Sequence, residues 1–332
     1  MTDNQELLRI GFIGAGEMAT WAILPALHFA PIRLQAICDL DRDRAETAAE
    51  KFGAQSCYTD YREMLANEDL GALIIQMHPG ARQAIVLDAL SAGYHVFMPK
   101  PPANSLAEAE ELAAAADDAG KCLMVNFQRR FSHGVSIARG LMQTDSFGTL
   151  TQISCSFCSG LFTGHRGRDY DNPIQAFLLD MAPHHLDLAR YLGGEVRKMS
   201  LHHHEAGDGV ALAIALEYQS GAVATLQLNS NRIWWRNYDR IEITGQGEYI
   251  VLDDLWSCKH YTEGGNRFTE NWSDERSGEL TGDGPCLVEF VSAIREQRDP
   301  VCSIRDAVET MRLYQAINDA VIDGRDGLVF EQ

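Results

Sequence analysis

The sequence predicts an α/β N-terminal domain with a doubly wound parallel sheet, followed by an α+β C-terminal domain with a large, mostly antiparallel open sheet. About the first 125 residues alternate short apolar runs with helical patterns, as βαβ units do. The second half changes to near-alternating runs joined by turn residues. A chain of 332 residues that is 45% apolar can fill two cores. The expected domains are 1–125 and 126–332.

In the first domain, apolar runs predict strands at Leu8–Ile13, Leu34–Cys38, Ala72–Gln76, Tyr94–Met98 and Cys122–Asn126. Helices are expected between them: one that passes through Met18 until Pro25 disturbs it, a short one capped by Asp60, and others over Arg42–Phe52, Arg82–Ala92 and Leu106–Ala119. Gly53, Gly93 and Gly120 follow the last three and suit their C-caps.

In the second domain, a hairpin is predicted across Gln219-Ser220-Gly221, because near-alternating runs flank that turn. The expected strands are Gly209–Leu216, Ala222–Leu228, Arg240–Thr244 and Tyr249–Leu252. Helical segments are expected near Ile174–Leu192, Leu287–Arg295 and Ile304–Val321, and Thr262–Gly284 is expected to be a long loop.

The net charge of −19, from 28 basic and 47 acidic residues, disfavours nucleic acid and anionic membranes as partners. The opening residues lack the apolar core of a secretory signal, and no stretch approaches the roughly 18 apolar residues of a spanning helix. The eight scattered cysteines are expected to be reduced thiols. These features predict a cytoplasmic protein.

A glycine motif follows the first predicted strand. Gly14-Ala15-Gly16-Glu17-Met18-Ala19 fits G-x-G-x-x-G/A, with a strand before it and a helix after it. Gly14 permits a tight turn, Gly16 lets the backbone approach a pyrophosphate, and Ala19 allows close helix packing. The pyrophosphate would meet the positive end of the helix, beside Glu17 and Met18. The motif therefore predicts a Rossmann domain that binds a dinucleotide.

Asp39 ends the second predicted strand. A carboxylate there accepts hydrogen bonds from the ribose hydroxyls and repels a 2′-phosphate, so NAD is favoured over NADP. Arg42 and Arg44 follow closely and could accommodate a phosphate instead. Alternatively, Asp39 caps the helix that starts near Arg42.

Five segments in this order resemble the glucose-fructose oxidoreductase / inositol dehydrogenase (Gfo/Idh/MocA) family, over nearly the whole chain. They are Gly14–Ala19 with Asp39, His95-Val96-Phe97-Met98-Pro99-Lys100-Pro101, Val125–Phe131, Asp180-Met181-Ala182-Pro183-His184-His185-Leu186-Asp187, and Arg240–Gly245. The third is similar to the segment that opens the family's second domain, and the fourth matches its D-x-x-x-H-x-x-D pattern.

The resemblance implies a nicotinamide in a cleft between a Rossmann domain and an open sheet, and redox chemistry at a carbon of a sugar, cyclitol or related polyol. It places the family's catalytic lysine at Lys100 and its paired aspartate and histidine at Asp180 and His184. The turn at Pro79 is expected to contact the cofactor, and a homodimer or homotetramer to form through the open sheet. Two positions depart from the family: Pro99 replaces the usual glutamate, and Gln83 replaces a common histidine.

The chemistry of these residue types agrees with the assignment. Removing hydride from an alcohol carbon requires a base for the hydroxyl proton, and histidine titrates near working pH. Pro183 is expected at the first position of a helix, where the positive helix end favours a neutral His184 and where Asp180 precedes the helix. Lys100 would end a parallel strand and stabilise negative charge on the reacting oxygen. Alternatively, Asp180 and Asp187 are surface or capping groups, His184–His185 a surface pair, and Lys100 a solvated turn residue.

Further substrate contacts are predicted from a basic loop and its surroundings. His165, Arg166 and Arg168 lie in a polar segment before Asp180 and either line the pocket, where they would meet an acidic sugar, or form a solvated loop. Trp235 would stack on a sugar ring or pack in an interface. Arg130 is a further candidate substrate residue.

No metal site is predicted. Cys155 and Cys158 lie three apart in a predicted strand and therefore on opposite faces, and they have no second pair to complete a zinc site. His202-His203-His204 also alternates across a strand and is interpreted as part of a sheet.

The predicted function is that of an NAD(P)-dependent dehydrogenase or reductase acting on a CH–OH group of a sugar, sugar acid or cyclitol. Two alternatives remain. Tightly held NAD could serve a redox-neutral hydrolysis or elimination on a glycoside, or the chain could be a non-catalytic NAD-binding sensor or scaffold.

Overall fold

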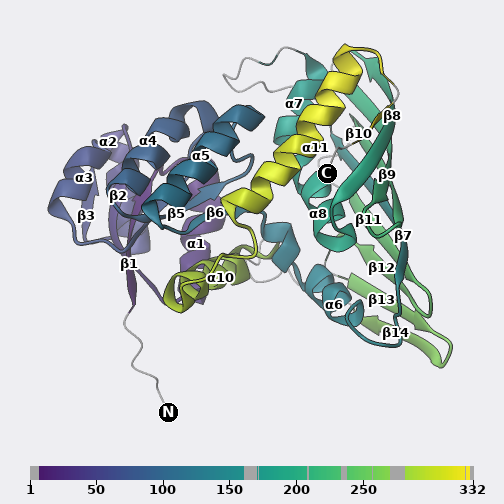
Figure 1. The fold of residues 1–332 in the computed structure, drawn as a ribbon. Coiled ribbons are helices and arrows are strands. Elements are labelled where there is room, and N and C mark those ends of the chain that lie inside the picture. The colour runs from purple at the N-terminus through teal and green to yellow at the C-terminus, as the bar shows by residue number, and fades with distance from the viewer. Residues whose placement is uncertain are drawn as a thin grey trace. The chain divides into compact units, whose positions relative to one another are not determined.

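A computed structural model describes residues 7–160, 170, 172–207, 209–232, 238–255, 257–269, 281–325 and 327–329. The chain folds into two compact units (Figure 1). The first contains Met1–Gln128 and Glu275–Glu309, and the second contains Arg129–Asp274 and Thr310–Gln332. The chain therefore enters the second unit twice, at Arg129 and again at Thr310.

The first unit is built on a six-stranded parallel sheet with the order β3-β2-β1-β4-β5-β6. Its strands are β1 (Leu8–Ile13), β2 (Ile32–Cys38), β3 (Ser56–Tyr58), β4 (Ala72–Ile75), β5 (His95–Pro99) and β6 (Leu123–Asn126). The strand order reverses between β1 and β4, and dinucleotides bind outside the carboxyl ends of strands at such a switch point. The predicted Rossmann architecture is confirmed.

Helices of the first unit flank this sheet. They are α1 (Leu24–Ala26), α2 (Arg42–Phe52), α3 (Tyr61–Asn67), α4 (Pro79–Ser91), α5 (Leu106–Ala119) and α10 (Asp283–Glu296). Helices α4 and α5 pack together, and α10 packs against α1 (Figure 1). Pro25, which lacks an N–H, does not end the first helix: a π-helical turn at Ala19–Ile23 precedes it, and Leu27–Phe29 continues as a 3-10 turn.

The second unit contains a nine-stranded, mostly antiparallel sheet, as predicted, with the order β14-β13-β12-β11-β7-β10-β9-β8-β15. Among its described strands, only β7 and β10 pair in parallel. The strands are β7 (Leu150–Gly160), β8 (Val196–Ala206), β9 (Gly209–Tyr218), β10 (Val223–Arg232), β11 (Tyr238–Gly245), β12 (Tyr249–Asp253), β13 (Ser257–Thr262), β14 (Gly265–Thr269) and β15 (Gly327–Val329).

Helices α6 (His133–Leu141), α7 (Pro173–Asp180) and α8 (Pro183–Gly193) cover one face of this sheet (Figure 1). Helix α11 (Ile304–Ile322) begins in the first unit and continues into the second. The covered face is apolar, as β9 illustrates: Ile214 and Leu216 are buried, whereas Ala213 and Ala215 face the other way and are exposed. No helix in the described ranges is long and apolar enough to cross a bilayer.

One predicted element differs in the structure. The segment expected to be a loop over Thr262–Gly284 contains β14, because Gly265 turns the chain back with φ +127° and lets Thr262 pair with it. The helical segments expected near Ile174–Leu192 are α7 and α8, and they separate at Pro183 as predicted, because proline cannot continue a helix and instead starts α8.

Candidate active site

The glycine turn after β1 has the geometry that a phosphate-binding loop needs. Gly14 has φ +93°, and a Cβ atom there would lie 2.4 Å from the carbonyl oxygen of Gln76. A Cβ on Gly16 would meet nothing within 4 Å, so open space lies over that residue. The helix starts directly afterwards, and Glu17 and Met18 in its first turn are exposed. This turn fits a pyrophosphate approached by backbone N–H groups.

Asp39 follows β2 and holds the glycine turn through its side chain. Its carboxylate accepts hydrogen bonds from the backbone N–H of Ala15 at 2.8 Å and of Asp41 at 2.9 Å, and it is only 9% exposed. The side chain of Arg44 reaches within 3.6 Å of the same carboxylate, whereas Arg42 pairs with Glu46. The carboxylate of Asp39 therefore lies beside the glycine turn and holds its backbone.

The alternative role of Asp39 as a helix cap is wrong. Asp41 is the N-cap of α2, and its side chain accepts a hydrogen bond from the backbone N–H of Arg44 at 3.2 Å. This hydrogen bond is the main reason why the pKa of Asp41 lies below its usual value.

Lys100 follows β5 at the carboxyl edge of the parallel sheet, and Pro79 is the first residue of α4 at the same edge. The fully buried guanidinium of Arg82 connects the two segments, because it donates hydrogen bonds to backbone carbonyls on both. The sequence analysis did not assign a role to Arg82.

The two positions that depart from the family have structural partners. Gln83 donates a hydrogen bond from its side-chain amide to the carboxylate of Glu111 at 2.5 Å on the surface. Pro99 pairs with Asn126 as the last residue of β5.

In the second unit, Asp180 ends α7 and His184 lies in the first turn of α8, directly after Pro183 at the first helical position. The predicted placement of Pro183 and Asp180 is confirmed. Both side chains are 8% exposed. Tyr170, which sequence reasoning did not assign, donates a hydrogen bond from its hydroxyl to Oδ2 of Asp180 at 2.7 Å. A phenol that donates to a carboxylate orients it and favours its charged form.

His185 points into a buried charged cluster that was not predicted. Its Nε2 contacts Oδ1 of Asp239, and Nη1 of Arg129 lies 2.8 Å from both of those atoms. The ring of Phe157 stacks on the imidazole with centroids 3.8 Å apart. Burial lowers the pKa of His185. Burial alone would raise the pKa of Asp239, but the charge of Arg129 and the contacts from His185 outweigh it and hold that pKa at about 2.

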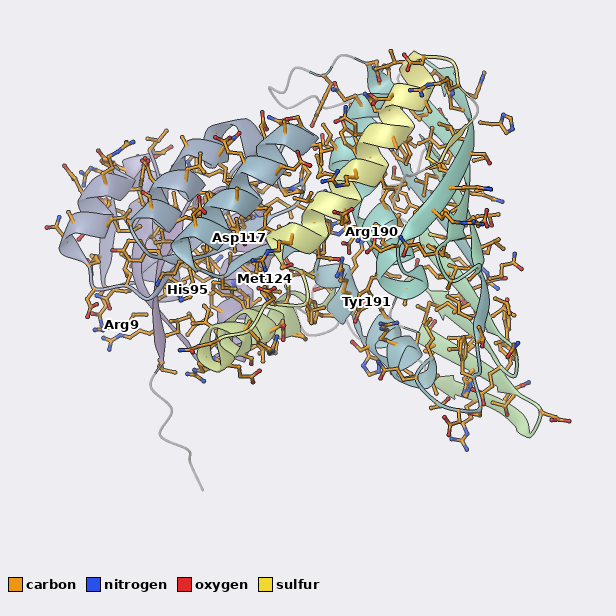
Figure 2. All side chains as sticks on the ribbon, in the orientation of Figure 1. Arg9, His95, Asp117, Met124, Arg190 and Tyr191 are labelled. Carbon is orange, nitrogen blue, oxygen red and sulfur yellow. The ribbon has the colours of Figure 1, made fainter. Side chains whose placement is uncertain are left out.

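Arg130 and Asp187 form a second buried ion pair. The guanidinium donates to both carboxylate oxygens, at 2.7 Å from Nε and 2.5 Å from Nη2, and the two side chains are 3% and 1% exposed. Tyr191, labelled in Figure 2, packs its ring under the guanidinium of Arg130 at 4.8 Å. The side chain of Arg130 is thus bound to two residues of α8, Asp187 and Tyr191. Because His185 and Asp187 are fully buried, the alternative that this motif is a set of surface groups is wrong.

The remaining candidates divide into two groups. His165, Arg166, Arg168 and Trp235 lie outside the described residues. Cys155 and Cys158 are free thiols on opposite faces of β7, and His202-His203-His204 lies exposed on β8, as the strand interpretation predicted. Within the described ranges, no three His, Cys, Asp or Glu side chains are grouped so that they could hold a metal ion.

Comparison with known proteins agrees with this geometry. A model described as "Oxidoreductase family, NAD-binding Rossmann fold" matches residues 8–127, and a GFO/IDH/MocA C-terminal domain model matches residues 135–251. The chain belongs to the Gfo/Idh/MocA family of oxidoreductases. The resemblance predicted from the sequence motifs is confirmed.

Within this family, the chain is 26% identical over 257 residues to myo-inositol 2-dehydrogenase of Thermotoga maritima, which covers 75% of this chain and 76% of that protein. Its fold matches a dehydrogenase from Chromobacterium violaceum with a TM-score of 0.89 at 24% identity, covering 97% of both chains. It also matches levoglucosan dehydrogenase in complex with NADH, with a TM-score of 0.84 at 19% identity, covering 98% and 99%. The two structural matches show a shared fold.

The buried cluster around His185 predicts a specific dependence of stability on pH. Because the pKa of His185 is lowered in the folded state, the unfolded chain binds a proton more readily below about pH 6.5, and stability falls as the pH drops below that value. The contribution is at most about 1.4 kcal/mol per pH unit. His185→Gln retains a hydrogen-bond donor but does not titrate, so it should flatten this slope.

Urea unfolding at pH 7.0, 6.0 and 5.5 measures the effect, with His203→Gln on the exposed strand β8 as the matched control. The control should keep the wild-type slope. Equal slopes for wild type and His185→Gln would show that His185 does not resist protonation in the folded protein.

Proposed function

We propose that this protein is an NAD-dependent dehydrogenase that transfers a hydride between nicotinamide and a CH–OH carbon of a sugar, sugar acid or cyclitol. The observation that carries the proposal is the placement of Asp180 and His184 at the neighbouring ends of α7 and α8, with Tyr170 bound to Asp180. A base and a carboxylate that orients it are what alcohol oxidation requires. The named activities of the relatives support the same substrate class.

Bound NAD would supply the hydride acceptor for the alcohol carbon. His184 takes the hydroxyl proton, and its place in the first turn of α8 favours the neutral, proton-accepting form. Asp180 orients His184 and balances its charge once it is protonated, and Tyr170 holds the carboxylate in place. Lys100 hydrogen-bonds the reacting oxygen and stabilises the negative charge that develops on it.

The first unit contributes the dinucleotide contacts: Gly14, Gly16, Glu17 and Met18 at the pyrophosphate, Asp39 at the adenosine ribose, and Pro79 and Lys100 toward the nicotinamide. Arg42 is exposed beside the ribose position but pairs with Glu46. The open space over Gly16 and the buried acid beside the turn support this fit. We do not propose Arg130 as a substrate contact, because its guanidinium is bound to the carboxylate of Asp187. The proposed substrate contacts are His165, Arg166, Arg168 and Trp235.

The charge of Asp39 should decide the cofactor. The wild-type protein is expected to bind NADH at least about tenfold more tightly than NADPH, because the carboxylate repels a 2′-phosphate. Asp39→Asn keeps an oxygen that can accept from Ala15 or Asp41 but removes the charge, so the preference should shrink to a few fold. Fluorescence titration of each nucleotide measures this.

Asp41→Asn is the matched control, because it keeps a capping residue on α2 two positions away. It should leave the preference unchanged. A wild-type protein that prefers NADPH would refute the role of Asp39 and implicate Arg42 or Arg44.

Removing the proposed base should abolish turnover without affecting cofactor binding. His184→Asn is expected to lower kcat by about 10²- to 10⁴-fold, the usual contribution of a general base, while the Kd for NADH stays unchanged. The assay measures the rate of NADH formation with myo-inositol, levoglucosan and related polyols as substrates. His203→Gln on β8 is the control, because its side chain is exposed. Undiminished turnover by His184→Asn would remove His184 from the mechanism.

The uncovered face of the large sheet is proposed to form a homodimer or homotetramer interface. Its central residues are small, as Ala213 and Ala215 on β9 show, and no helix of the described chain covers them. Ala215→Arg is expected to convert the oligomer to monomers, because a long charged side chain would be buried between two flat sheets. Sedimentation velocity measures this, with Glu50→Arg on α2 as the control. An unchanged mass for Ala215→Arg would place the interface elsewhere.

A further inference from the structure

We propose that Arg82 is a positioning residue that holds the two nicotinamide-facing segments of the first unit, and that it thereby sets the affinity for the nicotinamide half of the cofactor. The proposal rests on the function proposed above, because it takes Lys100 and the Pro79 turn as the groups that meet the nicotinamide.

Arg82 lies on α4 and is 0% exposed. Its Nη1 donates to the carbonyl oxygen of Met77 at 2.7 Å. Its Nη2 donates to the carbonyl oxygens of Pro101 at 2.5 Å and Pro102 at 2.9 Å. One side chain therefore binds the backbone on both sides: the turn that leads into α4 and the segment directly after Lys100.

Both segments need such a partner. Pro101 and Pro102 follow Lys100, and neither has an N–H that could join a regular backbone ladder. Both residues are buried, and a buried carbonyl group without a hydrogen-bond donor costs about 1–3 kcal/mol of stability. The guanidinium is planar and carries five donors in a rigid fork, so it can satisfy several carbonyls at once and fix their directions. A lysine at this position has a single ammonium and no such fork.

The position of Lys100 is then constrained from both sides. Before it, β5 pairs with β4 as far as Phe97 and with β6 as far as Pro99. After it, Arg82 holds Pro101 and Pro102. Farther along, α5 starts at the Ser105 cap: Glu108 donates its backbone N–H to the Ser105 hydroxyl and accepts from the N–H of Asn104 at 2.9 Å. These two hydrogen bonds fix the chain on both sides of the residue where α5 begins. Lys100 thus projects from a segment with little freedom to shift.

The adenosine half of the cofactor depends on different residues. Asp39 and the glycine turn hold one another through the Ala15 contact, whereas the guanidinium of Arg82 binds the backbone of Met77, Pro101 and Pro102. Loosening Arg82 should therefore displace Lys100 and the Pro79 turn while leaving the ribose and pyrophosphate contacts in place. A residue that serves only global stability would weaken both halves together.

The experiment compares NADH with ADP-ribose, which lacks the nicotinamide, by isothermal titration calorimetry. The variants are Arg82→Lys, which keeps the charge, and Arg82→Met, which keeps the length but no donor. Arg62→Met is the matched control, because Arg62 is an exposed arginine on α3 bound to Asp88. Both Arg82 variants should bind NADH about tenfold more weakly, the size of one lost charged hydrogen bond, with ADP-ribose affinity changed less than about twofold. The control should match wild type for both.

Arg82→Lys decides the question if Arg82→Met does not fold. Equal losses for NADH and ADP-ribose, or no loss for either, would overturn the proposal. The double variant Arg82→Lys/Lys100→Met tests whether Arg82 acts through Lys100. The losses in NADH affinity of the two single variants should then not add, because both changes weaken the contact between Lys100 and the nicotinamide half. Fully additive losses would contradict action through Lys100. A wild-type protein that binds neither probe would instead refute the proposed function itself.

Discussion

The Arg130–Asp187 ion pair is the interaction on which the second unit depends. Two charges that are almost completely buried are tolerated only if they are paired and hydrogen-bonded, and removal of one partner typically costs about 3–5 kcal/mol. Asp187 also lies 3.4 Å from the hydroxyl of Thr310, and Arg190 donates to that hydroxyl at 2.9 Å. Arg130 lies where the chain first enters this unit, and Thr310 lies where the chain returns to it. One helix, α8, therefore binds two segments of the unit that are far apart in the sequence.

This arrangement explains why the D-x-x-x-H-x-x-D segment contains more polar and charged groups than the two to which we assign a catalytic role. Pro183 starts the helix and places His184 in its first turn, beside the end of α7 that carries Asp180. The next residue, His185, turns into the sheet and meets Asp239 and Phe157, and Asp187 turns toward Arg130. The first turn is thus held by buried contacts on either side of the proposed base. A base held in this way needs little reorganisation at the moment of reaction.

The sequence alone predicted what depends on neighbouring residues. A glycine motif between a strand and a helix, an acid at the end of the next strand, and a proline that must start a helix are all local signals, and the structure has them where they were expected. Asp239 is 54 positions from His185, and Arg82 is 20 from Pro102, so their contacts arise only once the sheets form. The partner of Arg130 could not be predicted for the same reason: a lone arginine in a family motif does not reveal that the carboxylate it binds lies 57 positions away. A signal for Arg82 existed in the three prolines around Lys100, whose carbonyls would need a donor from elsewhere.

Asp39 shows how the same group can serve the fold and the ligand. Its carboxylate accepts a hydrogen bond from the backbone N–H of Ala15, between the two glycines of the turn. Glycine has more backbone freedom than any other residue, so a turn built on Gly14 alone would be loosely ordered. Ordering such a turn when a ligand binds would reduce the affinity. The acid supplies the order in advance, and it has further lone pairs with which to accept from a ribose. Arg82 does the corresponding work for the strand that ends in Lys100, with donors in place of acceptors, because the groups to be held there are carbonyls and not N–H groups. In both cases a buried side chain is matched to the backbone groups it binds, so the proposed ligand loops are held by the fold itself.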